Sequence, residues 1–150
     1  MISQEFILKS ENDSIELADK IAMQIKKGAI ITLNGDLGTG KTFFCRHIIK
    51  YLCGSDTKVI SPTFNLLQIY QAKNFEIYHF DLYRINHLEE IYELGIEEAF
   101  ADKVCLIEWS SIINNILPKD VISIKISILD QETRVVTISG SVITESNLNY

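Results

Sequence analysis

Residues 35–42 read Gly35-Asp36-Leu37-Gly38-Thr39-Gly40-Lys41-Thr42 and match the phosphate-loop pattern G-x-x-x-x-G-K-[ST]. An apolar, β-branched run, residues 29–33, precedes the loop, and residues 43–52 follow it with apolar side chains at helical spacing and no Pro or Gly. A loop that leaves a strand and opens a helix directs backbone N–H groups and the positive end of the helix dipole at one point. These flanks argue against a chance match, so the loop is predicted to hold a polyphosphate.

Each part of the loop has a predicted role at that phosphate. The glycines allow a tight turn and a close approach of the backbone, Lys41 is predicted to reach the β- and γ-phosphates, and the Thr42 hydroxyl is predicted to bind Mg²⁺. The expected nucleotide contacts of the loop and the helix start are Asp36, Leu37, Gly38, Thr39, Gly40, Lys41, Thr42 and Phe43. The N-K-x-D sequence of guanine-specific GTPases does not occur in the chain, which favours ATP as the nucleotide.

Bulk composition limits the classes of protein that the chain can belong to. Its 150 residues are enough for one domain, 1–150, and 47% hydrophobic and 23% charged residues are ordinary for a globular protein. No apolar run approaches the roughly 20 residues of a membrane span. The first six residues have neither a basic nor an apolar region of a secretion signal, so we do not expect secretion. Three scattered cysteines, Cys45, Cys53 and Cys105, are typical of a reduced, cytoplasmic protein. A net charge of −6 argues against an autonomous binder of DNA or RNA.

The pattern along the chain predicts an α/β fold. We expect strands at residues 5–8, 29–33, 66–70, 75–80, 104–107, 121–128 and 134–138. We expect helices from an N-cap at Asp13 or Ser14 to Ile25, at 43–52, at 86–101 with a break at Gly95, and at 111–117. The prediction is a P-loop NTPase-like, three-layer fold: a mixed, mainly parallel sheet flanked by helices, with a C-terminal antiparallel hairpin. The polar tail, residues 140–150, is expected to fray.

Two apolar runs end in a carboxylate, at Asp81 and at Glu108. Ligands of open α/β sheets bind beyond the carboxyl ends of the strands, so both acids would lie beside the phosphates if their strands run parallel to residues 29–33. There they would hold Mg²⁺ or orient water for hydrolysis. An ordinary helix cap is the alternative for each acid. Spacing alone does not say which of them binds the metal.

Four other polar residues are candidates for parts of the site. Thr63, fixed after Pro62, is either a sensor of the γ-phosphate or metal or a plain turn residue. Arg84 and Arg46 are candidates for neutralising charge in the transition state, with a surface salt bridge as the favoured alternative. His79 lies within a predicted strand, and we expect it to be packed rather than catalytic.

Four motifs in order resemble one family. They are the loop at 35–42, Ser-Pro-Thr-Phe at 61–64, Tyr-His-Phe-Asp-Leu-Tyr-Arg at 78–84 and Leu-Ile-Glu-Trp at 106–109. This set resembles the TsaE (YjeE) family, small bacterial ATPases of tRNA threonylcarbamoyladenosine biosynthesis. The resemblance implies ATP and Mg²⁺ as cofactors, and the TsaB–TsaD heterodimer as partner. It implies that the assembly modifies N6 of adenosine 37 in tRNAs that read ANN codons, with tRNA reached only through the complex.

The resemblance also implies residue roles. Lys41 and Thr42 match the family's phosphate and metal residues, and Asp81 and Glu108 match its functional carboxylates, with Glu108 as the metal ligand. Thr63 lies in the segment that matches a switch-like loop, and Ser14 matches a position near the adenine. The implied ATPase is weak alone, and hydrolysis resets the complex between turnovers.

Two other functions compete with an accessory ATPase. A small-molecule or nucleotide kinase would need an acceptor pocket and an Arg-rich lid, and the chain has few arginines and no insertion of that size. A nucleotide-sensing adaptor would bind ATP without hydrolysing it. Substitution of Asp81 or Glu108 would then leave function intact, while Lys41→Ala would abolish it.

Overall fold

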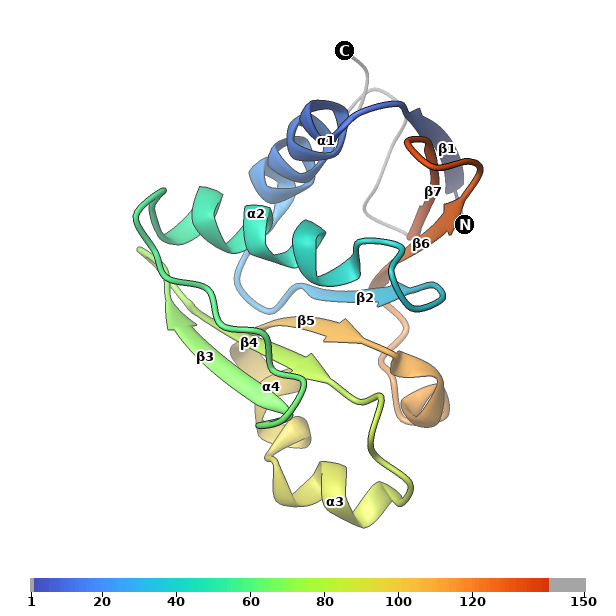
Figure 1. Cartoon of the computed structure of the whole chain (residues 1–150). Coiled ribbons are helices and arrows are strands. Elements are labelled where there is room, and N and C mark those ends of the chain that lie inside the picture. Colours follow the sequence, from blue (N-terminus) through green and yellow to red (C-terminus); the bar gives the residue numbers. More distant parts are fainter. Residues whose placement is uncertain (1, 141–150) are drawn as a thin grey trace.

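The computed structural model describes residues 2–140, whose strands form a seven-stranded sheet with helices on both faces (Figure 1). The strands are β1 (Ile2–Leu8), β2 (Ile30–Asn34), β3 (Leu67–Gln71), β4 (Glu76–Asp81), β5 (Val104–Glu108), β6 (Val121–Ile128) and β7 (Arg134–Gly140). The helices are α1 (Glu11–Gln24), α2 (Lys41–Cys53), α3 (Leu88–Glu93) and α4 (Ile96–Asp102), with a short 3₁₀ helix, η1 (Ser110–Ile113). The predicted fraying beyond Gly140 lies outside the described residues.

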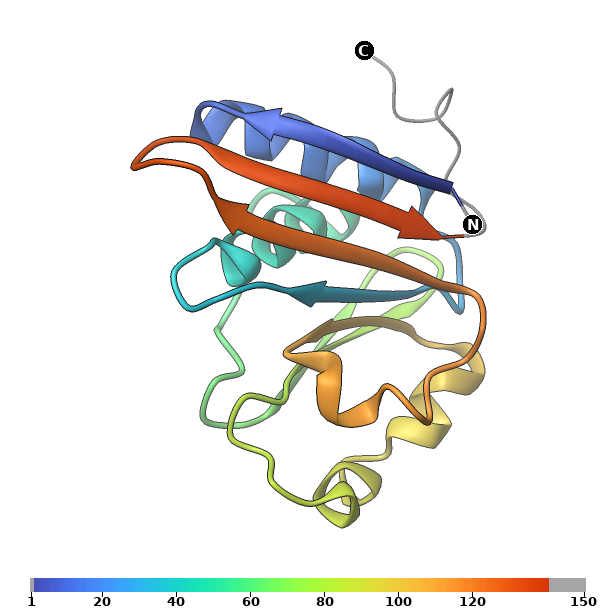
Figure 2. The same cartoon turned by 90° about the vertical axis from the view of Figure 1, so that its right-hand side faces the viewer.

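The strand order is β1-β7-β6-β2-β5-β4-β3. The central strands β6, β2, β5 and β4 are parallel, whereas β7 and β3 pair antiparallel with their neighbours, and β1 pairs antiparallel with β7 (Figure 2). The predicted parallel centre and the C-terminal β6–β7 hairpin are therefore confirmed. Because β2, β4 and β5 are parallel, the phosphate loop, Asp81 and Glu108 all lie at one edge of the sheet.

Alternation along the strands divides the core into two layers. Ile31 and Leu33 of β2 face α1 and α2, whereas Ile30 faces the side covered by α3, α4 and η1. The strand β5 is buried along its whole length, as predicted for a central strand with helices on both faces. By the same alternation, Ile77, His79 and Asp81 lie on the α2 side of β4. Within residues 2–140, no helix combines the length and the apolar content that a membrane crossing requires.

Two local predictions were wrong. The N-cap of α1 is Ser10, not Asp13 or Ser14: the Ser10 hydroxyl accepts from the Asp13 N–H at 3.1 Å, and the Asp13 carboxylate accepts from the Lys9 N–H at 2.9 Å. This reciprocal arrangement satisfies two backbone donors, which a cap three or four residues later would not.

The second wrong prediction is the α-helix at 111–117, which is instead the 3₁₀ helix η1 followed by turns. Its start is fixed to β2, because Ser110 N–H donates to Asn34 Oδ1 at 3.0 Å and Asn34 Nδ2 donates to Ser110 Oγ at 2.9 Å. Pro118 follows a few residues later and has no N–H for a further helical turn. A short segment tied to β2 at its start and followed closely by Pro118 forms the tighter, shorter helix.

Gly35 is required by a close approach of two backbones. A Cβ at this position would lie 2.3 Å from the Ile126 carbonyl oxygen and 2.9 Å from Thr39 Oγ1. We expect Gly35→Ala to lower the free energy of unfolding by about 1–3 kcal/mol, because the loop must shift away from β6. Gly28→Ala is the matched control: Gly28 also has a positive φ, of +88°, but a Cβ there meets nothing within 4 Å, so this variant measures the backbone strain without the contact. Urea denaturation of both variants measures the difference, and equal losses would contradict the steric account.

Candidate nucleotide-binding site

Two cavities flank the phosphate loop and share Gly40 and Phe43. The first, of about 380 Å³, contains the residues predicted to act on the phosphates and metal. It is lined by Leu37, Gly38, Gly40, Lys41, Thr42, Phe43, Thr63, Asp81, Tyr83, Arg84, Glu108 and Trp109. The structure thus brings the loop, both carboxylates and Thr63 together from segments far apart in sequence. Arg84 also reaches this cavity, whereas Arg46 does not line it.

Lys41 is folded back onto the loop that precedes it. Its Nζ donates to the carbonyl oxygens of Gly35 at 2.6 Å and Asp36 at 2.8 Å, and it lies 4.1 Å from the centroid of the Trp109 ring. Burial lowers the pKa of Lys41, against the opposing influence of the nearby carboxylates, chiefly Glu108. An ammonium held by two neutral carbonyls and an aromatic face is ready to exchange these contacts for phosphate oxygens.

Glu108 is buried, and each of its carboxylate oxygens has a partner. Oε1 accepts from the Thr42 hydroxyl at 2.8 Å, and Oε2 lies 2.7 Å from His79 Nε2. The contact with Thr42 follows from topology, because β5 pairs in parallel with β2, and α2 begins beyond the end of β2. Glu108 thus touches the residue predicted to bind the metal.

Asp81 lies opposite Glu108 in the β4–β5 register and is held by the loops around it. Its Oδ1 accepts from the Tyr83 N–H at 3.0 Å, and its Oδ2 accepts from the Thr63 hydroxyl at 3.3 Å. Thr63 is itself 2.8 Å from the Ser61 hydroxyl. Burial raises the pKa of Asp81, the negative charge of Glu108 raises it further, and the bonds from Tyr83 and Thr63 oppose the rise.

The raised pKa of Asp81 has a consequence for stability. The folded chain binds the Asp81 proton more tightly than the unfolded chain, whose carboxyl has a pKa near 3.8. The ionised group therefore destabilises the fold, and stability is lost as the pH rises above that value. We expect Asp81→Asn to raise the melting temperature at pH 7 and to lose this advantage as the pH falls toward 3.8. Melting curves of both proteins against pH test this, and a variant less stable at pH 7 would contradict it.

The second cavity, of about 550 Å³, lies on the other side of the loop. It is lined by Leu8, Lys9, Ser10, Glu11, Ser14, Thr39, Gly40, Phe43, Phe44, Ile126, Gln131, Glu132, Arg134 and Val136. Ser14 and Phe43, both predicted nucleotide contacts, meet here. Asp36, also a predicted nucleotide contact, lines neither cavity. Its carbonyl oxygen accepts a hydrogen bond from Lys41 Nζ.

Comparison with known proteins adds to this geometry. The family model described as threonylcarbamoyl adenosine biosynthesis protein TsaE matches residues 8–136. The chain belongs to the TsaE family. It is 51% identical over 140 residues to the tRNA threonylcarbamoyladenosine biosynthesis protein TsaE of Rickettsia bellii, covering 93% of this chain and 97% of the relative. It is 54% identical over 131 residues to the TsaE protein of Rickettsia conorii, covering 87% of this chain and 75% of the relative. The fold matches the crystal structure of Bacillus subtilis YdiB with a TM-score of 0.74 and 27% identity, over 93% of this chain and 86% of the other.

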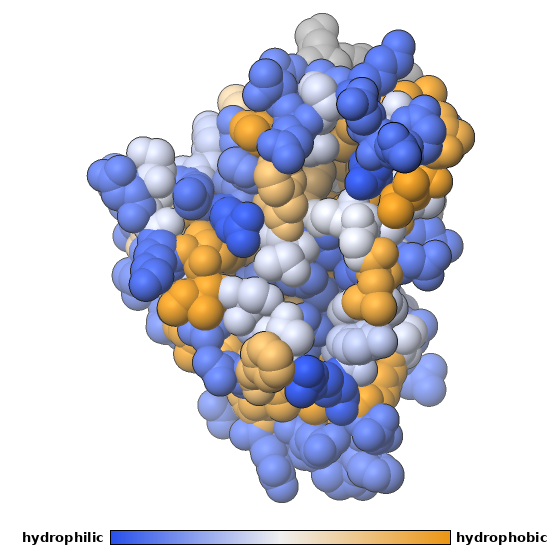
Figure 3. Space-filling view, viewed as in Figure 1, coloured by the Kyte–Doolittle hydropathy of each residue, from blue (hydrophilic) through white to orange (hydrophobic). Residues whose placement is uncertain are grey.

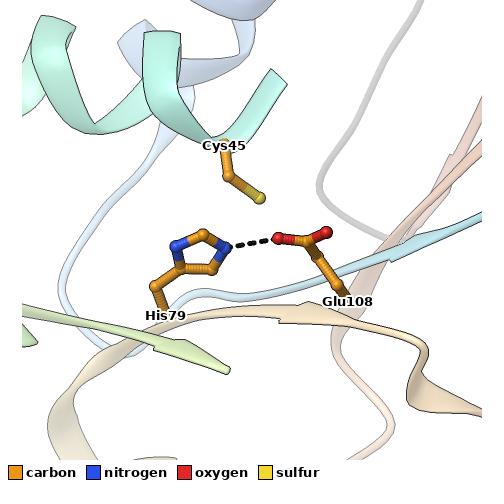
Figure 4. Close-up of side chains that lie close together, drawn as sticks. All are labelled: Cys45, His79 and Glu108. Atoms are coloured by element: carbon orange, nitrogen blue, oxygen red, sulfur yellow. Dashed lines mark hydrogen bonds and ion pairs between the residues drawn. The ribbon is translucent and has the colours of Figure 1, made fainter. Parts of the chain in front are cut away.

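The donor atoms of this TsaE-family site suit a hard cation beside a polyphosphate. Thr42, Glu108 and Asp81 offer only oxygen, the ligand that Mg²⁺ prefers. Among residues 2–140, Cys45, His79 and Glu108 are the one group of three His, Cys or acidic residues whose ligand atoms gather, within 4.8 Å of one another (Figure 4). In that group, burial raises the pKa of the Cys45 thiol well above its usual value, which disfavours the thiolate that a softer metal ion needs. A softer metal ion therefore fits this group poorly.

Sequence reasoning missed two contacts of the TsaE-family site. His79 was expected to be packed, and it is fully buried, but it also bonds to Glu108. The available signal was spacing, because His79 and Asp81 are two residues apart on one strand and so share a face. Arg134 was not singled out: its Nε donates to the Thr39 carbonyl at 3.2 Å and ties the β6–β7 hairpin to the loop. No motif marks that contact.

Proposed function

We propose that this chain is a Mg²⁺-dependent ATPase that serves tRNA threonylcarbamoyladenosine biosynthesis by coupling ATP hydrolysis to turnover of a TsaB–TsaD complex. Membership of the TsaE family supports the pathway. The observation that carries the hydrolytic role is the convergence of Lys41, Thr42, Asp81 and Glu108 around one cavity beside the phosphate loop. A site that only bound the nucleotide would need the loop but not two strand-end carboxylates.

The residues of the loop would bind and orient the triphosphate. Backbone N–H groups at the start of α2 point toward the phosphates, and Lys41 would leave the carbonyls of Gly35 and Asp36 for the β- and γ-phosphates. The nucleoside would occupy the second cavity, between Ser14 on α1 and Phe43 on α2. Arg134 would keep the hairpin wall of that cavity in place through its bond to Thr39.

The two carboxylates would divide the work on the γ-phosphate side. Thr42 and Glu108 would hold Mg²⁺, which when bound would neutralise charge on the β- and γ-phosphates. Asp81, which is buried and lies opposite Glu108 in the β4–β5 register, would orient the attacking water. Thr63, bonded to Asp81, would report whether the γ-phosphate is present.

The surface around the cavity fits a protein partner. Leu37, Phe64 and Tyr83 are 66%, 77% and 51% exposed, and the Arg84 guanidinium lies 4.4 Å from the centroid of the Phe64 ring. On the face shown in Figure 3, apolar side chains form several separate groups among polar ones rather than one continuous patch. A partner that contacts exposed apolar side chains beside a nucleotide site would respond to which nucleotide is bound. The net charge of −6 supports contact with tRNA through the partner, not directly.

Steady-state ATP turnover of the purified chain, with and without the TsaB–TsaD pair, tests the proposal. We expect slow turnover that requires Mg²⁺ and rises when the pair is added. Bound ATP that is never hydrolysed under either condition would favour the nucleotide-sensing adaptor. A phosphorylated metabolite formed from ATP would favour the kinase. Hydrolysis that ignores the pair would contradict the coupling.

A further inference from the structure

We infer that His79 is a positioning residue for Glu108: its Nε2–H holds one carboxylate oxygen so that the other faces Thr42 and the metal. The expected effect of His79 on hydrolysis rests on the proposed function. The hydrogen bond between His79 and Glu108 can be tested without ATP. It goes beyond the loop and the two strand-end acids, because it assigns a role to a side chain that lines neither cavity.

The contact is short and sealed from solvent. The distance from His79 Nε2 to Glu108 Oε2 is 2.7 Å, and the two side chains are 0% and 2% exposed. His79 reaches Glu108 from the neighbouring strand, where it lies opposite Leu106, two residue pairs before the Asp81–Glu108 pair in the ladder. In Figure 4 the imidazole edge points at the carboxylate, with Cys45 of α2 above both. Burial makes such a bond stronger than it would be in water.

The surroundings of the ring identify His79 as the donor. Its other nitrogen, Nδ1, is buried and has no hydrogen-bond partner among the described residues. A proton on Nδ1 would be a buried donor without an acceptor, which is costly, whereas a bare Nδ1 lone pair costs less. The geometry therefore places a ring proton on Nε2, where it donates to Glu108 Oε2.

Two donors on opposite oxygens fix the carboxylate. The Thr42 hydroxyl bonds to Oε1 at 2.8 Å, and His79 bonds to Oε2. Rotation of the carboxylate about its terminal bond would break both contacts. Partners behind a metal ligand set its orientation in this way, and their loss typically costs about 10–100-fold in metal affinity or activity. Without His79, only the Thr42 hydroxyl would hold the carboxylate, which would then be less well oriented toward the metal.

The matched pair His79→Gln and His79→Asn tests the role. Glutamine can place an amide N–H where Nε2 lies, whereas the shorter asparagine reaches only the position of Nδ1. We expect His79→Asn to raise the Mg²⁺ concentration for half-maximal hydrolysis about 10–100-fold, and His79→Gln to recover most of the loss. ATP affinity measured without Mg²⁺ should be alike in both, because the loop and Lys41 are intact. If both variants need the same raised Mg²⁺ concentration, His79 acts through packing alone. If His79→Asn behaves like the wild type, His79 has no role at the metal site. Either result overturns the inference.

Nitrogen-15 labelling of histidine gives a readout that needs no nucleotide. In the spectrum of the nucleotide-free chain, His79 should show a protonated Nε2 and a bare Nδ1, with the Nε2 proton shifted downfield by its bond to a carboxylate. Glu108→Gln should move that proton upfield. A proton on Nδ1 overturns the inference even if the chain hydrolyses ATP. A chain that hydrolyses no ATP but shows the Nε2 proton contradicts the proposed function and leaves the His79–Glu108 contact established.

Discussion

Glu108→Gln is expected to lower ATP turnover by roughly 10²–10³-fold, because a bound metal ion contributes several kcal/mol to the reaction and about 1.4 kcal/mol corresponds to a factor of ten in rate. The substitution keeps the shape of the side chain but removes the charge. It also replaces one acceptor oxygen with an amide NH₂ that would meet either the Thr42 hydroxyl or the His79 Nε2–H. Rapid-quench measurement of ADP formation at saturating Mg²⁺ and ATP gives the size of the effect.

The control for Glu108→Gln is the same chemical change at an exposed acid. Glu97, in the first turn of α4, is exposed and remote from both cavities. Glu97→Gln should turn over ATP like the wild type, and fluorescence titration with an ATP analogue should show that Glu108→Gln still binds nucleotide. Wild-type turnover by Glu108→Gln would show that hydrolysis does not depend on the Glu108 carboxylate.

Lys41→Met is expected to weaken ATP binding about 10²-fold. One bond between a charged pair contributes about 1.5–3 kcal/mol, and 1.4 kcal/mol corresponds to a factor of ten in affinity. The methionine keeps the apolar stem of the side chain, so the loss isolates the ammonium that now bonds to Gly35 and Asp36. Isothermal titration with a non-hydrolysable ATP analogue measures the affinity.

Lys50→Met, in the last turn of the same helix, is the matched control for Lys41→Met. It removes one positive charge far from the loop end of α2 and should bind ATP like the wild type. Melting curves should show both variants folded. Equal affinities for Lys41→Met and the wild type would mean that the phosphates lie elsewhere than beside Lys41.

The placement of the two strand-end carboxylates could be predicted because it depends only on the direction of the strands and on where each strand ends. Apolar runs that end in an acid indicated two strands. In the structure β5 pairs in parallel with β2, and β4 pairs in parallel with β5, so Glu108 and Asp81 both lie on the loop's side of the sheet. The loop itself is a local sequence feature, and its flanks determine what it can bind. The cavity that contains Lys41, Asp81 and Glu108 could therefore be predicted from the sequence pattern together with the rule that ligands bind at the carboxyl ends of parallel strands.

What could not be predicted depends on contacts between particular side chains. The His79–Glu108 bond needs the order and register of β4 and β5, and the Arg134–Thr39 bond needs the β6–β7 hairpin to reach the loop. The cap of α1 was misplaced because Ser10, Asp13 and Ser14 are all good cap residues, and only the Lys9–Asp13 bond selects the first.

The most direct test of the account is multiple-turnover formation of threonylcarbamoyladenosine on tRNA by the TsaB–TsaD pair supplied with this chain. With wild-type chain, Mg²⁺ and ATP, we expect modified tRNA to accumulate well beyond one equivalent of the pair. With Glu108→Gln, which should bind ATP but not hydrolyse it, we expect modification to stop near one equivalent. Continued turnover with Glu108→Gln would contradict the claim that hydrolysis at this site drives the cycle.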